Sequence, residues 1–204
     1  MIKNKDWEEL SIYNGNLYIG DLGNNSGTRR DLAIHRIKID SLSESKPPVL
    51  TTWIEYLMQK EYKRAIHNHE WDCEAMVVTK DGIFCFSKNW KDLTTRLYRV
   101  KEGKNNILSP IDSFNAGFLV TGAYYHSQGK SLYLCGYYKN ETYLLHFRNI
   151  DNVRFSEDYT KYIIPELRFI QVESIFVRGN YVYLASERTL KEQAIYRILV
   201  SGLK

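Results

Sequence analysis

The sequence predicts an all-β protein built from repeated antiparallel sheets, and three observations predict it. First, four segments align with one another, each with two short apolar strands joined by a turn rich in Gly, Asn or Asp. Second, a third strand-like segment follows each of these hairpins, at 32–37, 96–100, 143–147 and 194–198. Third, no helical periodicity of comparable strength competes with this pattern. The hairpins begin at Trp7, Cys73, Thr121 and Val172.

The spacing of the repeats narrows the fold class. Equivalent residues of the second strands, from Leu17 through Ile83 and Leu132 to Val182, are 66, 49 and 50 residues apart. A fourth strand is expected before each new repeat, at 51–58, 109–114 and 160–167. Four antiparallel strands per repeat of roughly 40 to 50 residues are typical of a β-propeller blade.

We therefore predict a single β-propeller-like domain over 1–204, with four-stranded blades at approximately 6–58, 72–115, 118–168 and 171–204. A stacked β-sandwich is the alternative, because short alternating strands build that fold too. The last repeat stops after its third strand, which gives fifteen predicted strands. We expect an incomplete propeller, truncated at its N-terminus, or one whose open edge is covered.

Composition excludes some partners. The 28 Lys and Arg residues exceed the 24 Asp and Glu residues by only four, and both signs are mixed along the chain, so no nucleic-acid partner is expected. No window approaches the ~18 apolar residues of a membrane span, and residues 1–9 lack the apolar core of a signal peptide. Cys73, Cys85 and Cys135 lie in strand-like runs and are interpreted as buried free thiols, not as a disulfide or a metal set.

The alignment brings acidic residues to one position of the predicted propeller. Glu8, Glu74 and Glu173 begin the first strand of three repeats, and that strand lines the central channel of a propeller. The third repeat departs, with Thr121 in this place. We expect the three glutamates to converge at one mouth of the channel.

Neighbouring residues follow from the alternation of side chains along a strand. Asp6, Asp72 and Gln171, two residues earlier, are expected on the same side as the glutamates. Trp7, Cys73 and Val172 are expected to point the other way and to pack between blades. The ends of the second strands reach the same mouth and carry Asp21, Lys88, Tyr137 and Glu187.

This set of side chains has three interpretations. Carboxylates around an apolar channel could bind a hard cation such as calcium, with Glu8, Glu74 and Glu173 as ligands. They could also form a polar pocket for a small ligand. Alternatively, they accept backbone N–H bonds and only fasten the blades together. Catalysis is the least favoured role, because no nucleophile motif or phosphate-binding loop occurs in the sequence.

Two shorter motifs have structural alternatives as well. The segment 21–25 is oxygen-rich, and its Gly and Asn residues favour a tight turn over a cation-binding loop. His67 and His69 could bind a transition metal, but they lie in an insertion without an evident third ligand, which favours a solvated loop. His35 and His146 align with tyrosines of the third strands and are interpreted as packing residues.

With these motifs in view, the chain resembles a family of uncharacterised bacterial β-propeller proteins common in Bacteroidetes. The resemblance rests on an ordered set of segments: DWE from Asp6, GDLGNN from Gly20, DCEA from Asp72, TGA from Thr121 and VES from Val172. It implies a propeller fold and a family of mostly exported proteins, generally longer, with a signal peptide and a further blade before the DWE segment. It implies no catalytic residues.

Two functions follow as expectations. The first is a binding or scaffold module for a protein or small-molecule ligand, which uses the carboxylate-bearing mouth and needs no cofactor. The second is a calcium-dependent hydrolase similar to lactonase and phosphotriesterase propellers, in which the cation polarises the substrate and activates water. In that case Lys88 would stabilise developing negative charge.

Overall fold

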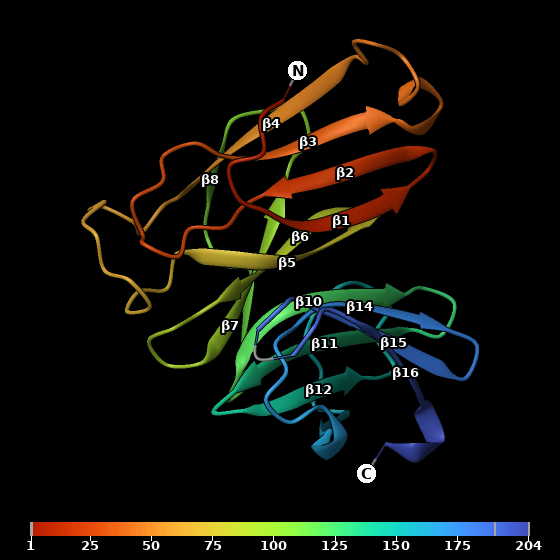
Figure 1. Cartoon of the computed structure of the whole chain (residues 1–204). Helices are drawn as coiled ribbons and strands as arrows, with labels where there is room; N and C mark the ends of the chain where they lie inside the picture. Colours follow the sequence, from red (N-terminus) through yellow and green to blue (C-terminus); the bar gives the residue numbers. More distant parts are fainter. Residues whose placement is uncertain (1, 190, 204) are drawn as a thin grey trace.

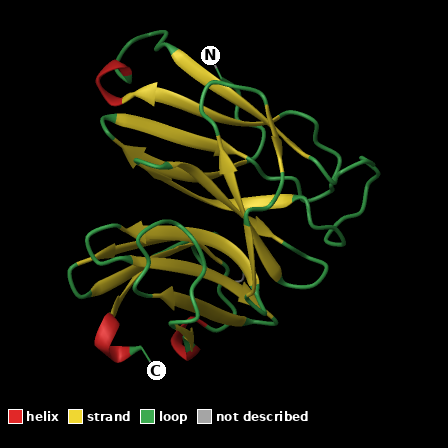
Figure 2. Ribbon diagram, turned by 180° about the vertical axis from the view of Figure 1, so that it is seen from behind, coloured by secondary structure: helices red, strands yellow, loops and turns green. Residues whose placement is uncertain are grey.

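The computed structural model describes residues 2–189 and 191–203. Four antiparallel sheets stand in a ring, the arrangement of a four-bladed β-propeller (Figures 1 and 2). Three short 3-10 turns complete the secondary structure (Ile39–Ser41, Pro165–Leu167 and Val200–Gly202). In the described part of the chain, no helix is long and apolar enough to cross a membrane.

Each blade runs outward from its first strand, which lies nearest the channel. Blade one holds β1 (Trp7–Tyr13), β2 (Asn16–Asp21), β3 (Leu32–Lys38) and β4 (Val49–Tyr56). Blade two holds β5 (Asp72–Thr79), β6 (Gly82–Lys88), β7 (Thr94–Val100) and β9 (Asp112–Asn115). Blade three holds β10 (Leu119–His126), β11 (Ser131–Tyr138), β12 (Glu141–Phe147) and β13 (Tyr159–Ile163). Blade four holds β14 (Val172–Arg178), β15 (Tyr181–Ser186) and β16 (Ile195–Leu199).

These strands lie close to the predicted positions, with two differences. The strand expected at 160–167 ends at Ile163, because Pro165 lacks a backbone donor and begins a 3-10 turn. The structure also contains a strand that the repeats did not predict, β8 (Asn106–Leu108), which pairs in parallel with β4. Blade two thereby supplies an extra strand to the outer edge of blade one.

Hydrophobic cores hold consecutive blades together. Tyr18 and Ile34 of blade one pack in one buried cluster with Met76 and Tyr98 of blade two. A second cluster joins blades two and three, and includes Phe86, Phe118 and Leu134. A third joins blades three and four, and includes Cys135, Val172 and Leu184. Burial of apolar surface, which contributes roughly 25 cal/mol per Å² to the free energy of folding, therefore holds consecutive blades together.

The predicted packing of Trp7 between blades is wrong. Cys73 and Val172 are fully buried between blades as expected, but Trp7 is 37% exposed. In the described residues, the three cores join blades one to four in sequence and no fourth core joins blade four to blade one. Leu10 and Ile12 are exposed for the same reason. The three cysteines are buried and free, which confirms that prediction.

The inner strands share an irregularity. Each carries a β-bulge at the same place, so that one residue has no partner across the hairpin: Glu8, Glu74, Thr121 and Glu173. A bulge bends the strand and changes the direction of the side chains beside it. The three glutamates predicted at the channel mouth are therefore the bulged residues of their blades.

Candidate carboxylate site at the channel mouth

A cavity of about 550 Å³ opens at the mouth of the channel. Glu8, Glu74 and Glu173 all line it, each from the bulge of a different blade. The structure therefore brings together the three glutamates that the alignment selected. The remaining predicted residues in the lining are Asp6, Lys88, Tyr137, Gln171 and Glu187.

Lys88 supplies a positive charge to this cluster. Its Nζ lies 2.7 Å from both carboxylate oxygens of Glu74, and both side chains are about 95% buried. The ammonium also donates to the Tyr137 hydroxyl at 3.1 Å. These short distances make Lys88 and Glu74 an ion pair, in which burial raises the pKa of Glu74 and the charge of Lys88 opposes that rise. Burial alone would lower the pKa of Lys88, but the charge of Glu74 raises it.

Glu173 completes the cluster around Lys88. Its carboxyl group lines the same cavity as Glu74, Lys88 and Tyr137. Burial raises the pKa of Glu173 to about 7, against the opposing effect of the Lys88 ammonium. Glu173 therefore exchanges its proton near neutral pH.

Asp6 and Glu8 form a second carboxyl pair in the lining of the cavity. Both carboxyl groups lie against the backbone of Gly23. Burial raises the pKa of Glu8 to about 8, and the charges of Asp6 and Asp72 add to the rise. Burial also raises the pKa of Asp6. This pair is therefore expected to hold one proton at neutral pH.

Gly23 has no side chain, and this leaves room for the carboxyl groups of Asp6 and Glu8. A Cβ atom at this position would overlap both carboxyl groups. The residue is not among those with positive φ, so its role is close approach and not backbone freedom. The sequence predicted a tight turn over 21–25, and the structure places the turn slightly later in the chain. The residue with positive φ in this loop is Gly27, and its N–H donates to the Asn24 carbonyl at 2.7 Å.

Asp72 and Asp21 hold the mouth together and do not line the cavity. Asp72 is fully buried and accepts hydrogen bonds from the Asn24 backbone N–H (2.6 Å) and from Trp90 Nε1 (3.0 Å). Asp21 accepts from the backbone N–H of Asp6 (3.1 Å) and pairs with Arg29 at 2.8 Å. Both carboxylates fasten loops to strands, which is the structural interpretation.

Aromatic side chains form the rim of the cavity, and sequence reasoning did not select them for it. Trp7, Trp90 and His67 all line the cavity. The His67 ring stacks on Trp90 with centroids 3.9 Å apart, and Lys88 Nζ lies 4.9 Å from the centre of the Trp90 ring. Trp90 lies in the loop between β6 and β7, directly after the end of the second strand of blade two. His67 lies in an insertion between blades, so no repeat position could have indicated it.

His69 corrects the expectation of a solvated histidine loop. It is buried, with Nε2 3.1 Å from the Asn25 carbonyl, while Nδ1 accepts the backbone N–H of Trp71 at 3.1 Å. This pattern fixes the proton on Nε2. His69 thus joins the insertion to the loop after β2, and neither ring nitrogen is left for a metal.

The third blade contributes no carboxylate to the mouth. Its bulged residue, Thr121, is fully buried, and its hydroxyl donates to the Val172 carbonyl at 2.5 Å. The bulge position therefore serves two purposes: in blade three it links neighbouring blades, and in the other blades it presents an acid to the cavity.

The calcium interpretation meets an obstacle in this geometry. The ammonium of Lys88 occupies the place beside Glu74 that a cation would take. Across the residues that the structure describes, no group of three or more His, Cys, Asp and Glu side chains has an arrangement suited to a metal ion. Calcium binding by Glu8, Glu74 and Glu173 stays a prediction.

Comparison with known proteins supports the fold and goes no further. No family model and no curated protein matches the sequence. A crystal structure of glucose dehydrogenase is similar with a TM-score of 0.54 and 12% identity, over 93% of this chain. The chain spans 62% of the length of that protein. The computationally designed protein Ika4 is more distant, with a TM-score of 0.42 and 9% identity over 97% of this chain and 92% of Ika4.

Proposed function

We propose that the protein is a β-propeller binding module whose ligand site is the cavity at the channel mouth. The ligand class that fits it is a small, water-soluble molecule with two or more positive charges. One observation carries this proposal: acidic side chains from three blades converge on a cavity of about 550 Å³ that also contains one buried ammonium group.

The charge of the lining supports a cationic ligand. Five carboxyl groups border the cavity: Asp6, Glu8, Glu74, Glu173 and Glu187. Among the described lining residues, Lys88 is the one lysine. The raised pKa values of Glu8 and Glu173 mean that protons compensate part of the negative charge at pH 7. A ligand that brings ammonium groups would displace those protons and form charge-assisted hydrogen bonds in their place.

The shape and the rim support the same class. A cavity of this volume suits a small molecule. The rings of Trp7 and Trp90 border it, and aromatic faces attract cations by about 0.5–2 kcal/mol. A ligand with separated amines could contact the Asp6 and Glu8 pair with one amine and Glu173 with the other.

A calorimetric titration with a matched pair of ligands tests this proposal. We expect 1,4-diaminobutane to bind and 1,4-butanediol, which has the same chain without charge, not to bind. Glu173→Gln should weaken binding of the diamine at least tenfold, whereas Glu44→Gln, on an exposed loop, should leave it unchanged. Equal binding of diol and diamine would contradict the proposal.

The calcium hypothesis is tested in the same instrument. Calcium chloride is titrated into chelator-treated protein and into Glu74→Gln. Calcium binding that the substitution abolishes, without binding of the diamine, would replace the proposed module with a calcium site. Binding of the diamine alone would support the module.

A further inference from the structure

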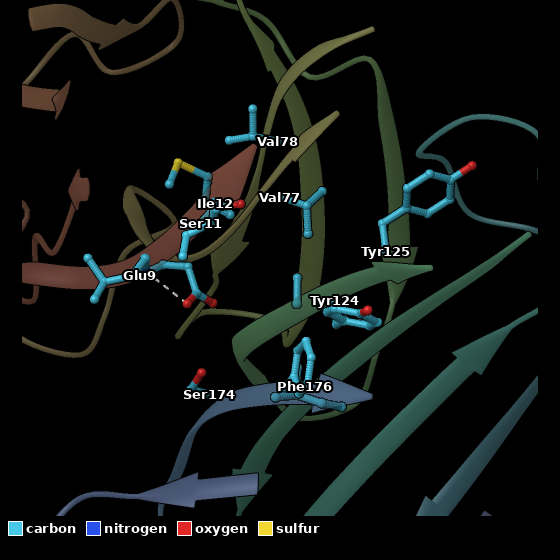
Figure 3. A pocket seen from close by; sticks show the side chains of 13 residues that line it. Glu9, Ser11, Ile12, Val77, Val78, Tyr124, Tyr125, Ser174 and Phe176 are labelled. Carbon is cyan, nitrogen blue, oxygen red and sulfur yellow. Dashed lines mark hydrogen bonds between the residues drawn. The ribbon is translucent and has the colours of Figure 1, made fainter. Parts of the chain in front are cut away.

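We propose a second binding site, inside the channel and distinct from the mouth, in which Glu9 anchors a monoamine with an apolar or aromatic body. A cavity of about 310 Å³ lies along the inner strands β1, β5, β10 and β14. Its lining shares no residue with that of the mouth cavity. Figure 3 shows the carboxyl group of Glu9 directed from β1 into this space.

Glu9 is an exception among the four blades. It follows the bulge in β1, and the equivalent residues of the other inner strands are Ala75, Gly122 and Ser174. Small side chains at this position let neighbouring inner strands approach: a Cβ atom on Gly122 would lie 3.0 Å from the Cα of Ser174. Blade one alone places a long acidic side chain here.

The carboxyl group of Glu9 is incompletely bonded. Glu9 is buried, with 7% of the residue exposed. Its Oε1 accepts the backbone N–H of Leu10 at 3.0 Å, and the backbone N–H of Ala123 lies near enough to lower the pKa of Glu9, but no donor meets hydrogen-bond geometry at the buried Oε2. A buried oxygen without a partner costs about 1–3 kcal/mol. A donor on a ligand would remove that cost.

The charge of the surroundings selects a cation. Of the described side chains that line the cavity, Glu9 is the one carboxyl group, and none is Lys, Arg or His. Burial raises the pKa of Glu9 well above its usual range, and the nearby charge of Glu8 adds to the rise. No protein cation in the lining balances an ionised Glu9, so an ammonium group from a ligand would be its counter-ion.

The rest of the lining selects the body of the ligand. Tyr124 and Phe176 form an edge-to-face pair with centroids 5.1 Å apart, and Phe176 is 49% exposed (Figure 3). Val77 and Ile12 line the cavity beside them. These faces suit one aromatic or aliphatic group with a single amine, whereas a second charge would find no partner. This distinguishes the ligand from that of the mouth.

Binding is expected to release one proton. The free amine carries its proton as an ammonium in water, and Glu9 carries one as a carboxylic acid. In the complex the amine and the carboxyl group together retain one of these two protons, and the other passes to the buffer. The affinity for the amine should therefore rise about tenfold per pH unit while the pH stays below the pKa of Glu9.

The test is calorimetric titration with 2-phenylethylamine and with its neutral analogue 2-phenylethanol, in two buffers of different ionisation enthalpy. We expect the amine to bind with release of protons to the buffer at pH 7, and the alcohol to bind at least tenfold more weakly. Glu9→Gln should abolish proton release and weaken amine binding at least tenfold. Glu173→Gln, at the mouth, should leave both unchanged.

Three results would overturn the proposal: equal affinity for alcohol and amine, binding without proton release, or loss of binding in Glu173→Gln but not in Glu9→Gln. The last result would assign the amine to the mouth. If Glu9→Gln fails to fold, Phe176→Leu provides the second variant, because it changes only the apolar wall. Unchanged amine affinity in that variant would also contradict the site. Failure of the proposal for the mouth cavity would appear in a different experiment, the titration with 1,4-diaminobutane.

Discussion

Glu74 and Glu9 are two buried carboxyl groups on neighbouring inner strands, and the protein accommodates them differently. Glu74 has the Lys88 ammonium 2.7 Å from both oxygens, whereas Glu9 accepts a backbone N–H at 3.0 Å and has no Lys, Arg or His among the described residues that line its cavity. The difference originates at the end of the second strand, where β6 of blade two supplies a lysine. Burial raises the pKa of both groups, and at Glu74 a lysine ammonium opposes that rise.

The largest expected effect concerns the ion pair. Lys88→Met leaves the Glu74 carboxylate buried without its cation, and should lower the free energy of unfolding by about 3–5 kcal/mol at pH 8. Urea unfolding measures it, with the exposed Lys101→Met as control. Adding Glu74→Gln to Lys88→Met should recover part of the loss. Equal effects of the two lysine substitutions would contradict the pairing.

A second effect is expected from pH, and it accumulates over several pH units. Glu8 and Glu173 have raised pKa values in the folded protein, about 8 and about 7. Between their usual value of 4.5 and these values, the folded state binds protons that the unfolded state has lost. The free energy of unfolding should therefore fall as pH rises from about 5 to 8, by up to about 1.4 kcal/mol per pH unit for each group.

Urea unfolding at pH 5, 6, 7 and 8 checks this dependence. Glu8→Gln should flatten the curve up to pH 8, and Glu173→Gln should flatten it up to pH 7. The exposed Glu44→Gln is the control and should keep the slope of the unmodified protein. Stability that rises over this range would show that the mouth carboxyl groups are ionised and bonded in the folded protein.

The contrast between the two carboxyl groups predicts a small effect for Glu9. Glu9→Gln should change the free energy of unfolding by less than about 1 kcal/mol, because the amide has nearly the same shape and replaces a carboxyl group whose charged form is disfavoured by burial. Glu74→Gln should lower the free energy of unfolding by a larger amount, since it leaves the Lys88 ammonium buried without its charge partner. Thermal unfolding of both variants distinguishes them, and a reversed order would invalidate the comparison.

The smallest effect is expected at Trp7. Trp7→Ala should cost less than about 1 kcal/mol, because the side chain is 37% exposed and no inter-blade core surrounds it. Phe86→Ala, fully buried between blades two and three, should cost about 3–5 kcal/mol. Denaturation midpoints compare the two. A large loss for Trp7 would mean that something packs on this face in solution.

The sequence predicted the blades because their signals are local. Each hairpin combines alternating apolar residues with a turn that needs special backbone angles, as at Asn14 and Gly15, both with positive φ. The convergence of Glu8, Glu74 and Glu173 followed from the alignment of those hairpins. The position of Trp7 did not follow, because packing depends on a neighbouring blade and not on strand alternation.

Other parts of the mouth depend on contacts distant in sequence. The bulges at the glutamates arise from hydrogen bonding across the hairpin, for which a single strand carries no signal. His67 stacks on Trp90 from an insertion with no counterpart in other repeats. Glu9 could have been noticed, since the aligned positions hold Ala75, Gly122 and Ser174. Strand alternation alone directs Glu9 away from the side of Glu8, and the bulge at Glu8 changes its surroundings.

The central claim is that the carboxyl groups of the mouth share protons around a single buried ammonium. NMR titration of protein with 13C-labelled glutamate side chains, assigned with Glu8→Gln and Glu173→Gln, tests it most directly. We predict midpoints near 8 for Glu8 and near 7 for Glu173, with the Glu173 midpoint moving upward in Lys88→Met. Midpoints of about 4 to 5 for both residues, as in unfolded peptides, would contradict the account.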